Sequence, residues 1–385
     1  MKIISVDPIL VDRYLLVQIT TDEGITGLGE SGAWGFIEAS EAAVRKFSTY
    51  LVGKDPLLIE HHWQYMYRST HFRGAAIMGA LSAIDIALWD IAGKFHGVPV
   101  YSLLGGRVRD KARVYYHVFG KTREELVSGI LDAKARGFTA VGHLTPFLDE
   151  GRSVPYFKTG VAKIRDAIEA VGIYRDAVGN DVDLCIEIHR RLTPAEAVQL
   201  GQGIEQFHPF FYEDPVMMDN YDEMAYVADK VNVPIATGER YTSIWDFAML
   251  LSRGAAQYVR PDVCMVGGIS GARKVAALAE SQHVGVVPHN PLSPVSTAAC
   301  LQIAALAPNF ALQEYPTDSW SSFVERPPVG DLVAGAAQLD EHGFLVFNDN
   351  PGIGVTLQED AAEKWPYRPR PLEARLNVDG SIVDQ

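Results

Sequence analysis

Three short apolar segments follow one another at even spacing in this sequence: VDLCIEI (182–188), FFYED (210–214) and VPIATGE (233–239). Each carries an acidic residue at or next to its end, and these residues, Glu187, Glu213 and Glu239, are 26 positions apart. A short strand, a helix and two loops fill an interval of this size. The segments therefore predict consecutive parallel strands whose carboxyl ends, with their glutamates, lie together.

The same pattern extends in both directions from this stretch. Helical patterns such as TREELVSGILDAKARG (122–137) alternate with short apolar runs. Eight strand–helix units of this size predict an α/β fold whose main domain is a TIM-type (β/α) barrel. The five additional strand candidates are ARVYYHV (112–118), FTAVGHL (138–144), QYVRPD (257–262), VGVVPH (284–289) and FALQE (310–314).

The N-terminal part has a different pattern. VDRYLLVQITTDEGITGLGE (11–30) alternates apolar and polar residues around a central turn, as a β-hairpin does. Helical periodicity begins near Ile37. From Ala75 to His96 apolar residues recur every three or four positions, and Gly97 then ends the helix. These features predict a small α+β unit ahead of the barrel.

The chain has 385 residues, which is too long for one ordinary core. We expect residues 1–110 to form an α+β capping domain and residues 111–315 to form the barrel. Residues 316–385 are expected to be a C-terminal segment that returns to the cap and helps to form it.

Composition narrows the classes of partner. Apolar residues make up 48% of the chain and the formal net charge is −14, which argues against nucleic acid and anionic membrane surfaces as partners. A small anionic substrate stays compatible, because a metal ion or an arginine can dominate the field in a site. No run approaches the length of an apolar membrane span, so no membrane association is expected.

Cysteine usage and the first residues indicate the compartment. The three cysteines, Cys185, Cys264 and Cys300, are few and widely separated, as in proteins whose thiols stay reduced. The first twenty residues lack the uninterrupted apolar core of a signal peptide. We therefore expect a cytoplasmic protein.

Polar residues recur at the ends of the predicted strands, where a barrel places its catalytic groups. Three carboxylates brought together in this way repel one another, and a hard divalent cation removes the conflict. Oxygen ligands favour Mg²⁺ as the cofactor, held by the three glutamates, whereas the histidines keep zinc as an alternative. For any single glutamate, a solvated carboxylate that caps a helix is the competing interpretation. The strand-end residues are Glu187, His189, Glu213, Glu239, Asp262, His289 and Glu314.

Asp262 and His289 lie at the ends of neighbouring predicted strands. A carboxylate bonded to one imidazole nitrogen fixes the tautomer and raises the basicity of the other nitrogen. The pair therefore suggests a general base, with a purely structural His–Asp contact as the alternative.

Several ordered motifs resemble one known family. The helix ALSAIDIALWDIAGKFHGVP (80–99) is similar to the signature helix of the mandelate racemase and muconate-lactonizing enzyme branch of the enolase superfamily. Shorter motifs along nearly the full chain extend the resemblance. They are IEIH (186–189), YEDP (212–215), GER (238–240), RPDVCMVGGIS (260–270), VPHN (287–290) and NPGIGV (350–355).

Within that branch the chain most resembles dehydratases of sugar acids such as galactonate and gluconate. The resemblance implies that His289 is the base, Asp262 its partner and His189 the acid that protonates the leaving β-hydroxyl. It places Glu314 near the substrate carboxylate. It also implies Mg²⁺, a 2-keto-3-deoxy acid as product and a homo-oligomer. The first metal ligand of the branch is usually Asp, whereas here it is Glu187.

Two other functions stay open at this point. A racemase, epimerase or cycloisomerase uses the same metal site, but its usual lysine pair is replaced here by a segment that contains His143. A catalytically silent protein that binds sugar acids is the third hypothesis, and the complete set of ligands and base argues against it. His143 itself is predicted either to contact substrate or to pack at a strand end.

Two glycine-bearing loops of the predicted cap are candidates for substrate recognition. They are GESGAWGF (29–36) and HFRG (71–74). Trp34, His71 and Arg73 are the predicted contacts to hydroxyl or carboxylate groups, with surface or packing roles as the alternative.

Overall fold

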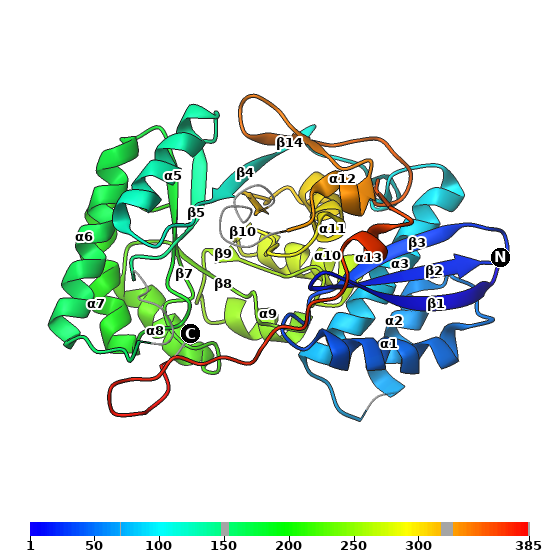
Figure 1. The fold of residues 1–385 in the computed structure, drawn as a ribbon, viewed down its shortest axis with the longest axis horizontal. Coiled ribbons are helices and arrows are strands. Elements are labelled where there is room, and N and C mark those ends of the chain that lie inside the picture. The colour runs from blue at the N-terminus through cyan, green and yellow to red at the C-terminus, as the bar shows by residue number, and fades with distance from the viewer. Residues whose placement is uncertain (70, 148–153, 317–325, 384–385) are drawn as a thin grey trace.

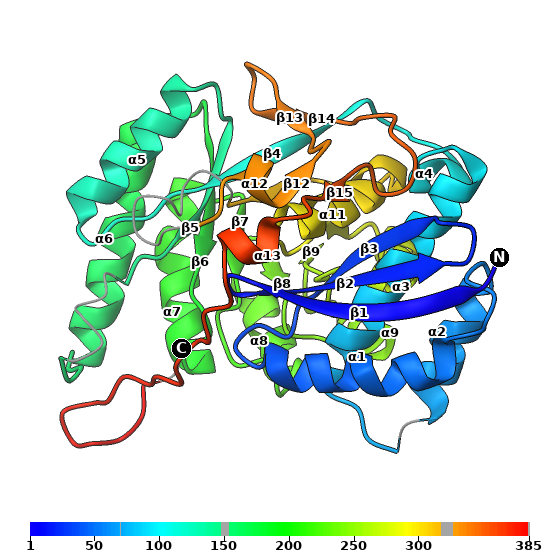
Figure 2. The same cartoon turned by 45° about the vertical axis from the view of Figure 1, so that its right-hand side comes forward.

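The computed structural model describes residues 1–69, 71–147, 154–316 and 326–383. An N-terminal part, built from a small antiparallel sheet and three helices, packs against a larger part made of alternating strands and helices (Figures 1 and 2). The elements of the N-terminal part are β1 (Ile3–Val11), β2 (Tyr14–Thr21), β3 (Thr26–Ser31), α1 (Ile37–Leu51), α2 (Ile59–Ser69) and α3 (Ala75–His96).

The predicted hairpin and the predicted long helix are both confirmed. β2 pairs with β3 in antiparallel register, with Gln18 opposite Leu28. Helix α3 spans the expected residues, and Gly97 ends it in the left-handed conformation with φ +69°. The α3 backbone lies against β3, where Gly27 and Gly29 have no side chain to keep it away.

Helix α3 is long and apolar enough to cross a membrane by length and composition, but 78% of its apolar stretch is buried inside the protein. One side of the helix packs on the cap sheet, and the other contacts α10 of the larger part. Burial on both sides therefore explains why α3 is apolar around almost its whole surface.

All eight predicted strands are present, although most are shorter than expected. They run parallel in the paired order β10, β9, β8, β7, β6, β5, β4 and β11. The strands are β4 (Lys111–His117), β5 (Ala140–Leu144), β6 (Asp183–Glu187), β7 (Phe211–Glu213), β8 (Ile235–Thr237), β9 (Tyr258–Val259), β10 (Gly285–Val286) and β11 (Gln313–Tyr315).

Helices connect these strands. One short helix, α4 (Val100–Leu103), precedes the first of them, and the connecting helices are α5 (Arg123–Ala135), α6 (Gly160–Val178), α7 (Pro194–Ile204), η1 (Glu205–Phe207), α8 (Tyr221–Lys230), α9 (Ile244–Leu251), α10 (Gly268–Glu280) and α11 (Pro294–Leu306). α7 continues directly into η1.

The ring of strands has one seam. β10 and the residues before β11 share a single parallel bridge, between Val286 and Phe310, with hydrogen bonds to Asn309 and from Ala311 (both 2.9 Å). Among the described residues no continuous ladder closes the ring here, so the expected closed barrel is found only as an eight-stranded parallel sheet. β9 and β10 are short because each is followed at once by a segment that contains a proline, which has no N–H to donate to a ladder.

The inner faces of the strands share one apolar layer. It packs as a single cluster, which brings the strands around a common interior despite the seam. Its buried members, one from each of seven strand segments, are Tyr115, Ala140, Cys185, Phe211, Ala236, Val287 and Leu312.

The C-terminal segment contacts both parts. Its hairpin β13–β14 pairs antiparallel with β4 of the larger sheet. Further along, Trp365 and Arg368 hydrogen-bond the backbone of Asp12 in the cap. Its elements are α12 (Val329–Leu332), β12 (Val333–Ala334), β13 (Gln338–Leu339), β14 (Phe344–Val346), β15 (Thr356–Leu357) and α13 (Ala361–Lys364).

The close approach of β3 to α3 makes a stability prediction. A Cβ on Gly29 would collide with the backbone carbonyl of Ala83. We expect Gly29→Ala to lower the free energy of unfolding by about 2–4 kcal/mol, measured by urea denaturation, because the helix must move away from the sheet. Gly160→Ala is the control, since no atom lies within 4 Å of the added Cβ and the change is expected to be neutral or slightly stabilising. Equal effects of the two substitutions would contradict the packing argument.

Candidate active site

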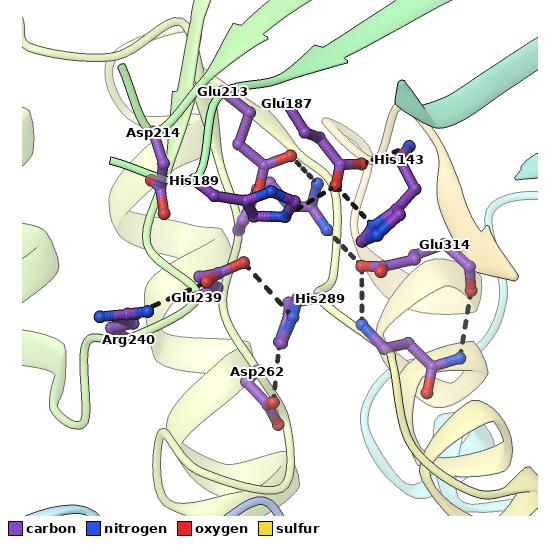
Figure 3. Close-up of polar contacts among 12 residues, drawn as sticks. His143, Glu187, His189, Glu213, Asp214, Glu239, Arg240, Asp262, His289 and Glu314 are labelled. Carbon is purple, nitrogen blue, oxygen red and sulfur yellow. Dashed lines mark hydrogen bonds and ion pairs between the residues drawn. The ribbon is translucent and has the colours of Figure 1, made fainter. Parts of the chain in front are cut away.

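Carboxylates gather at the carboxyl ends of β6, β7 and β8. Glu187 ends β6 and lies opposite Glu213, which ends β7, while Glu239 follows β8 by two residues. Parallel pairing of adjacent strands brings the first two side by side. The side chains are turned toward one region at the strand ends, together with His189 and His289 (Figure 3).

Two histidines hold the carboxylate of Glu187. The backbone N–H of His143 donates to Oε1 (2.7 Å), and its Nδ1 lies 3.0 Å from Oε2. Nε2 of His189 lies 3.5 Å from the same Oε2. Burial alone would raise the pKa of Glu187, but these two imidazoles outweigh it and hold the pKa well below its usual range. His143 therefore contacts a predicted metal ligand, and whether it also touches substrate stays a prediction.

Arg260 is fully buried and bridges two acids. Its guanidinium forms ion pairs with Glu213 and with Glu314. Burial raises the pKa of Glu213 well above its usual range, and the charges of Glu187 and Glu239 add to this effect against the opposing charge of Arg260. Burial and the neighbouring carboxylates together therefore outweigh the arginine beside Glu213.

The carboxylate of Glu314 has more partners than that of Glu213. It accepts a hydrogen bond from the backbone N–H of Asn290 (2.8 Å), and Nε2 of His117 lies 2.8 Å from Oε1. Burial opposes ionisation, but Arg260, His289 and the bond to His117 together lower the pKa of Glu314 to about 2. This carboxylate is ionised throughout the neutral range.

The third glutamate lies between an arginine and a histidine. Arg190 donates to Glu239 Oε1 (2.5 Å) and to Asp214 (2.8 Å), while His289 Nε2 lies 3.4 Å from Glu239 Oε2. These positive neighbours hold the pKa of Glu239 below its usual value although burial acts in the other direction.

Among the residues that the structure describes, two groups of side chains have donor atoms close enough to hold a cation. The donors of Glu213, Asp214 and Glu239 lie within 4.8 Å of one another, and so do those of His117, His143 and Glu187. The structure thus adds Asp214 to two of the predicted ligands. In this arrangement Glu187, the first predicted ligand, groups with the histidines.

The predicted His–Asp pair is formed. His289 Nδ1 lies 2.9 Å from Asp262 Oδ2, and a parallel bridge joins the two backbones. The other oxygen of Asp262 accepts from the N–H of Cys264 (2.8 Å), which fixes the carboxylate. Burial favours the neutral imidazole, yet Glu314, Glu239 and Asp262 raise the pKa of His289 to about 9. Its Nε2 faces the carboxylate cluster, 3.4 Å from Glu239 Oε2, in the orientation that a proton acceptor needs, and compensation of these carboxylates by a cation would lower the pKa of the imidazole toward neutral.

Backbone strain concentrates at the same place. Four residues of the site have positive φ, a conformation that costs energy for residues other than glycine. His143, His189, Arg190 and Asp214 have φ values of 56°, 55°, 65° and 41°. This strain turns side chains at consecutive strand ends toward one point.

The cap residues that were predicted to recognise substrate contact other side chains than the active-site carboxylates. Trp34 stacks on Arg370, 3.4 Å from the ring centroid, and Arg73 lies over the ring of Tyr67. Arg73 also lines a hollow of about 450 Å³ between the cap and the β8–α9 loop. Within the described part of the chain, no polar contact joins Trp34, Arg73 or the exposed His71 to the carboxylates, so their roles as substrate contacts stay predictions.

Five residues of the site were not singled out from the sequence. Each follows the same rule as the predicted ones, because it stands at or beside the end of a strand candidate. The signal was therefore present in the sequence, in the motifs YYHV, IHR, YEDP, VRPD and VPHN. These residues are His117, Arg190, Asp214, Arg260 and Asn290.

Two family models together match most of the chain. Residues 3–105 match the mandelate racemase / muconate lactonizing enzyme N-terminal domain, and residues 139–361 match the enolase C-terminal domain-like family. The chain belongs to the mandelate racemase and muconate-lactonizing enzyme family of the enolase superfamily, and it is an enzyme of that family.

Similar proteins agree with this assignment. A D-galactonate dehydratase of Xanthomonas oryzae pv. oryzae is 37% identical over 379 residues, covering 97% of this chain and 96% of that protein. A D-galactonate dehydratase family member of Streptomyces bingchenggensis is 33% identical and covers 99% of this chain and 97% of its own length. The crystal structure of an enolase from Agrobacterium radiobacter, with bound sodium and L-malate, superimposes over the full length of both chains with a TM-score of 0.92 at 29% identity.

The buried arginine makes a second stability prediction. Arg260→Met would leave Glu213 and Glu314 buried without their cation, so we expect a loss of about 3–5 kcal/mol in the free energy of unfolding by urea denaturation. Arg45→Met is the control, because its ion pair with Glu41 lies on the surface and is worth less than about 1 kcal/mol. A loss at Arg260 no larger than that at Arg45 would show that the buried pairs contribute little.

Proposed function

We propose that this enzyme is a Mg²⁺-dependent hydro-lyase that dehydrates an acid sugar, an aldonate such as galactonate or gluconate, to a 2-keto-3-deoxy acid. One observation carries the proposal. Two imidazoles, His289 and His189, reach the same carboxylate cluster from different strands, and only His289 is backed by an aspartate. Elimination of water next to a carboxylate needs one base and one acid, which is what two such imidazoles supply.

A divalent cation fits the donor set, and we infer that Glu187, Glu213 and Glu239 hold it. Burial raises the pKa of Glu213, and the charges of Glu187 and Glu239 add to the rise, while the charges of Glu314, Glu239 and Asp262 raise the pKa of His289, so a cation would relieve both groups. Oxygen donors of this kind suit Mg²⁺. Bound there, Mg²⁺ would supply Lewis acidity that stabilises charge developing on the substrate carboxylate.

The reaction then follows from the protein's own residues. His289 accepts the proton from the carbon next to the carboxylate, and Asp262 fixes its tautomer and stabilises the imidazolium. The bonding pair moves into the carboxylate to give an enediolate. As this collapses, the β-hydroxyl leaves with a proton from His189 as water. The resulting enol tautomerises to the 2-keto-3-deoxy acid, so atoms and charge balance.

Glu314 has a supporting part in this scheme. It is ionised and held by Arg260, His117 and Asn290, so its orientation is fixed before substrate arrives. We infer that it lies beside the substrate carboxylate and keeps His289 charged after proton transfer, which makes the transfer more favourable.

Similar proteins support the substrate class. D-galactonate dehydratases are among the relatives, and L-malate, itself a hydroxy acid, is bound in the similar enolase structure. We further infer that the eight strands act as a closed TIM-type barrel, that the protein works in the cytoplasm, and that it forms a homo-oligomer, as expected from the sequence. Trp34, His71, Arg73 and His143 are the proposed substrate contacts.

Replacing each histidine separates the two chemical steps. In D₂O, His289→Asn is expected to abolish both deuterium uptake at the α-carbon and formation of keto acid, with rates lowered by about 100-fold or more. His189→Asn is expected to lose keto acid formation while recovered substrate still gains deuterium, because the base is intact. Mass spectrometry of substrate and a keto acid assay give both readouts.

The alternative function gives a different result in the same assay. A racemase or epimerase would incorporate deuterium in the unmodified enzyme and invert the α-carbon without releasing any keto acid. Full activity of His289→Asn would show that the base is another residue.

Removal of the cation tests the metal site. We expect EDTA to abolish dehydration and Mg²⁺ to restore it. Saturating Mg²⁺ should also stabilise the fold by about 2.7 kcal/mol at 100 times its Kd, measured as a rise in Tm. Glu213→Gln should weaken this rise, whereas Glu341→Gln, on the surface, should leave it unchanged. Activity that survives EDTA would contradict the metal assignment.

A further inference from the structure

The carboxyl end of β3 carries a fully buried acid of the cap. Glu30 has no exposed surface and reaches across to the start of α11 in the larger part. It accepts hydrogen bonds from the hydroxyl of Ser293 (2.5 Å), from the N–H of Ser293 (3.2 Å) and from the N–H of Ser296 (2.9 Å). An anion at the first turn of a helix is favourable, because unpaired N–H groups converge there.

The residues that Glu30 holds are the continuation of the loop that carries His289. Only three residues separate His289 from Ser293. At its other end this loop is tied to the barrel by the N–H of His289, which donates to Pro261 O (3.2 Å), and by the Asn290 side chain, which donates to Thr297 and to Glu314 O. Glu30 is thus an anchor that the cap contributes to a loop whose other anchors belong to the barrel.

The same strand end also contacts the turn that carries Asp262. Two residues after Glu30, the N–H of Gly32 donates to Cys264 O (2.7 Å). A Cβ on Gly32 would lie only 3.1 Å from Asp262 Oδ1 and from the Cys264 carbonyl. One short piece of the cap therefore lies against the turn that carries Asp262 and also binds the residues that follow the loop of His289.

We propose that Glu30 is a positioning residue that couples docking of the cap to the placement of His289 against Asp262. The inference rests on the proposed role of His289 as base. A proton transfer is sensitive to shifts of an ångström in the acceptor. When the cap is docked, Glu30 fixes the start of α11, and the short connection passes this constraint to the imidazole.

Burial of this carboxylate has a cost that a simple docking contact avoids. Taking an acid out of water is unfavourable, and burial raises the pKa of Glu30 to about 7 although all three hydrogen bonds oppose the rise. A neutral side chain would join two surfaces at lower cost. We therefore explain the presence of a buried acid at this point by its position next to the loop that carries His289.

Another buried acid of the cap provides a matched control. Asp90 on α3 accepts hydrogen bonds from the N–H of Leu28 (2.9 Å) and of Ile353 (2.9 Å), and from Lys94. It joins the cap to the C-terminal segment, and none of these hydrogen bonds reaches the loops that carry His289 or Asp262. Asp90→Asn therefore perturbs the cap without touching the base.

The experiment compares Glu30→Gln with Asp90→Asn in the full-length protein with Mg²⁺. We expect Glu30→Gln to lower kcat by about 10- to 100-fold while KM changes by less than about threefold. With α-deuterated substrate the kinetic isotope effect should rise, because proton abstraction becomes slower than the other steps. Asp90→Asn should lower Tm as much or more, with kcat and the isotope effect close to those of the unmodified enzyme.

A second measurement needs no substrate. With ¹⁵N-labelled histidine, the Nδ1–H resonance of His289 is assigned by its loss in His289→Asn. We expect Glu30→Gln to shift or broaden this resonance and Asp90→Asn to leave it in place. An unchanged resonance and kcat in Glu30→Gln, or equal changes in both variants, overturn the proposal. An unmodified enzyme that dehydrates no acid sugar overturns the proposed function instead, and the resonance still tests the positioning.

Discussion

The constraint on which this structure depends is the crowding of carboxylates at one end of a parallel sheet. Glu187, Glu213, Glu239 and Glu314 are all buried or nearly so, and each would be driven toward protonation without a positive neighbour. Arg260 supplies such a positive neighbour: its side chain is fully buried and forms ion pairs with two of these carboxylates, Glu213 and Glu314. The positive neighbours keep Glu314 ionised, whereas at Glu213 burial and the charges of the neighbouring carboxylates outweigh the arginine.

The division between the two parts of the molecule follows from packing. The cap presents α3, apolar on nearly every side, and glycines on β3 let the helix lie directly on the sheet. The polar contacts across the junction include buried acids that accept from backbone N–H groups, such as Asp85 with Ser270, and the indole of Trp63, which donates to Gly267 O. Such bonds are directional, so the apolar surfaces provide the affinity between the parts and the acids fix their relative position.

Much of the fold was predictable because its signals are local. The even spacing of Glu187, Glu213 and Glu239 predicted successive strand–helix units, and the apolar period predicted α3 to the residue. The single-bridge seam was not predictable, since it depends on how two short strands meet across the ring. Arg260 and His117 were missed although both stand near strand ends, because a buried side chain that pairs with acids is recognised only once those acids are known from distant strands.

The left-handed backbone of His143, His189, Arg190 and Asp214 has a consequence for how this family can change. Asparagine and glycine adopt such a conformation readily, whereas β-branched residues do so at high cost. The residues acceptable at these four strand ends are therefore limited by geometry before chemistry is considered. Descendants of this sequence that acquire a new substrate would do so more easily by altering loops of the cap than by exchanging residues at these positions.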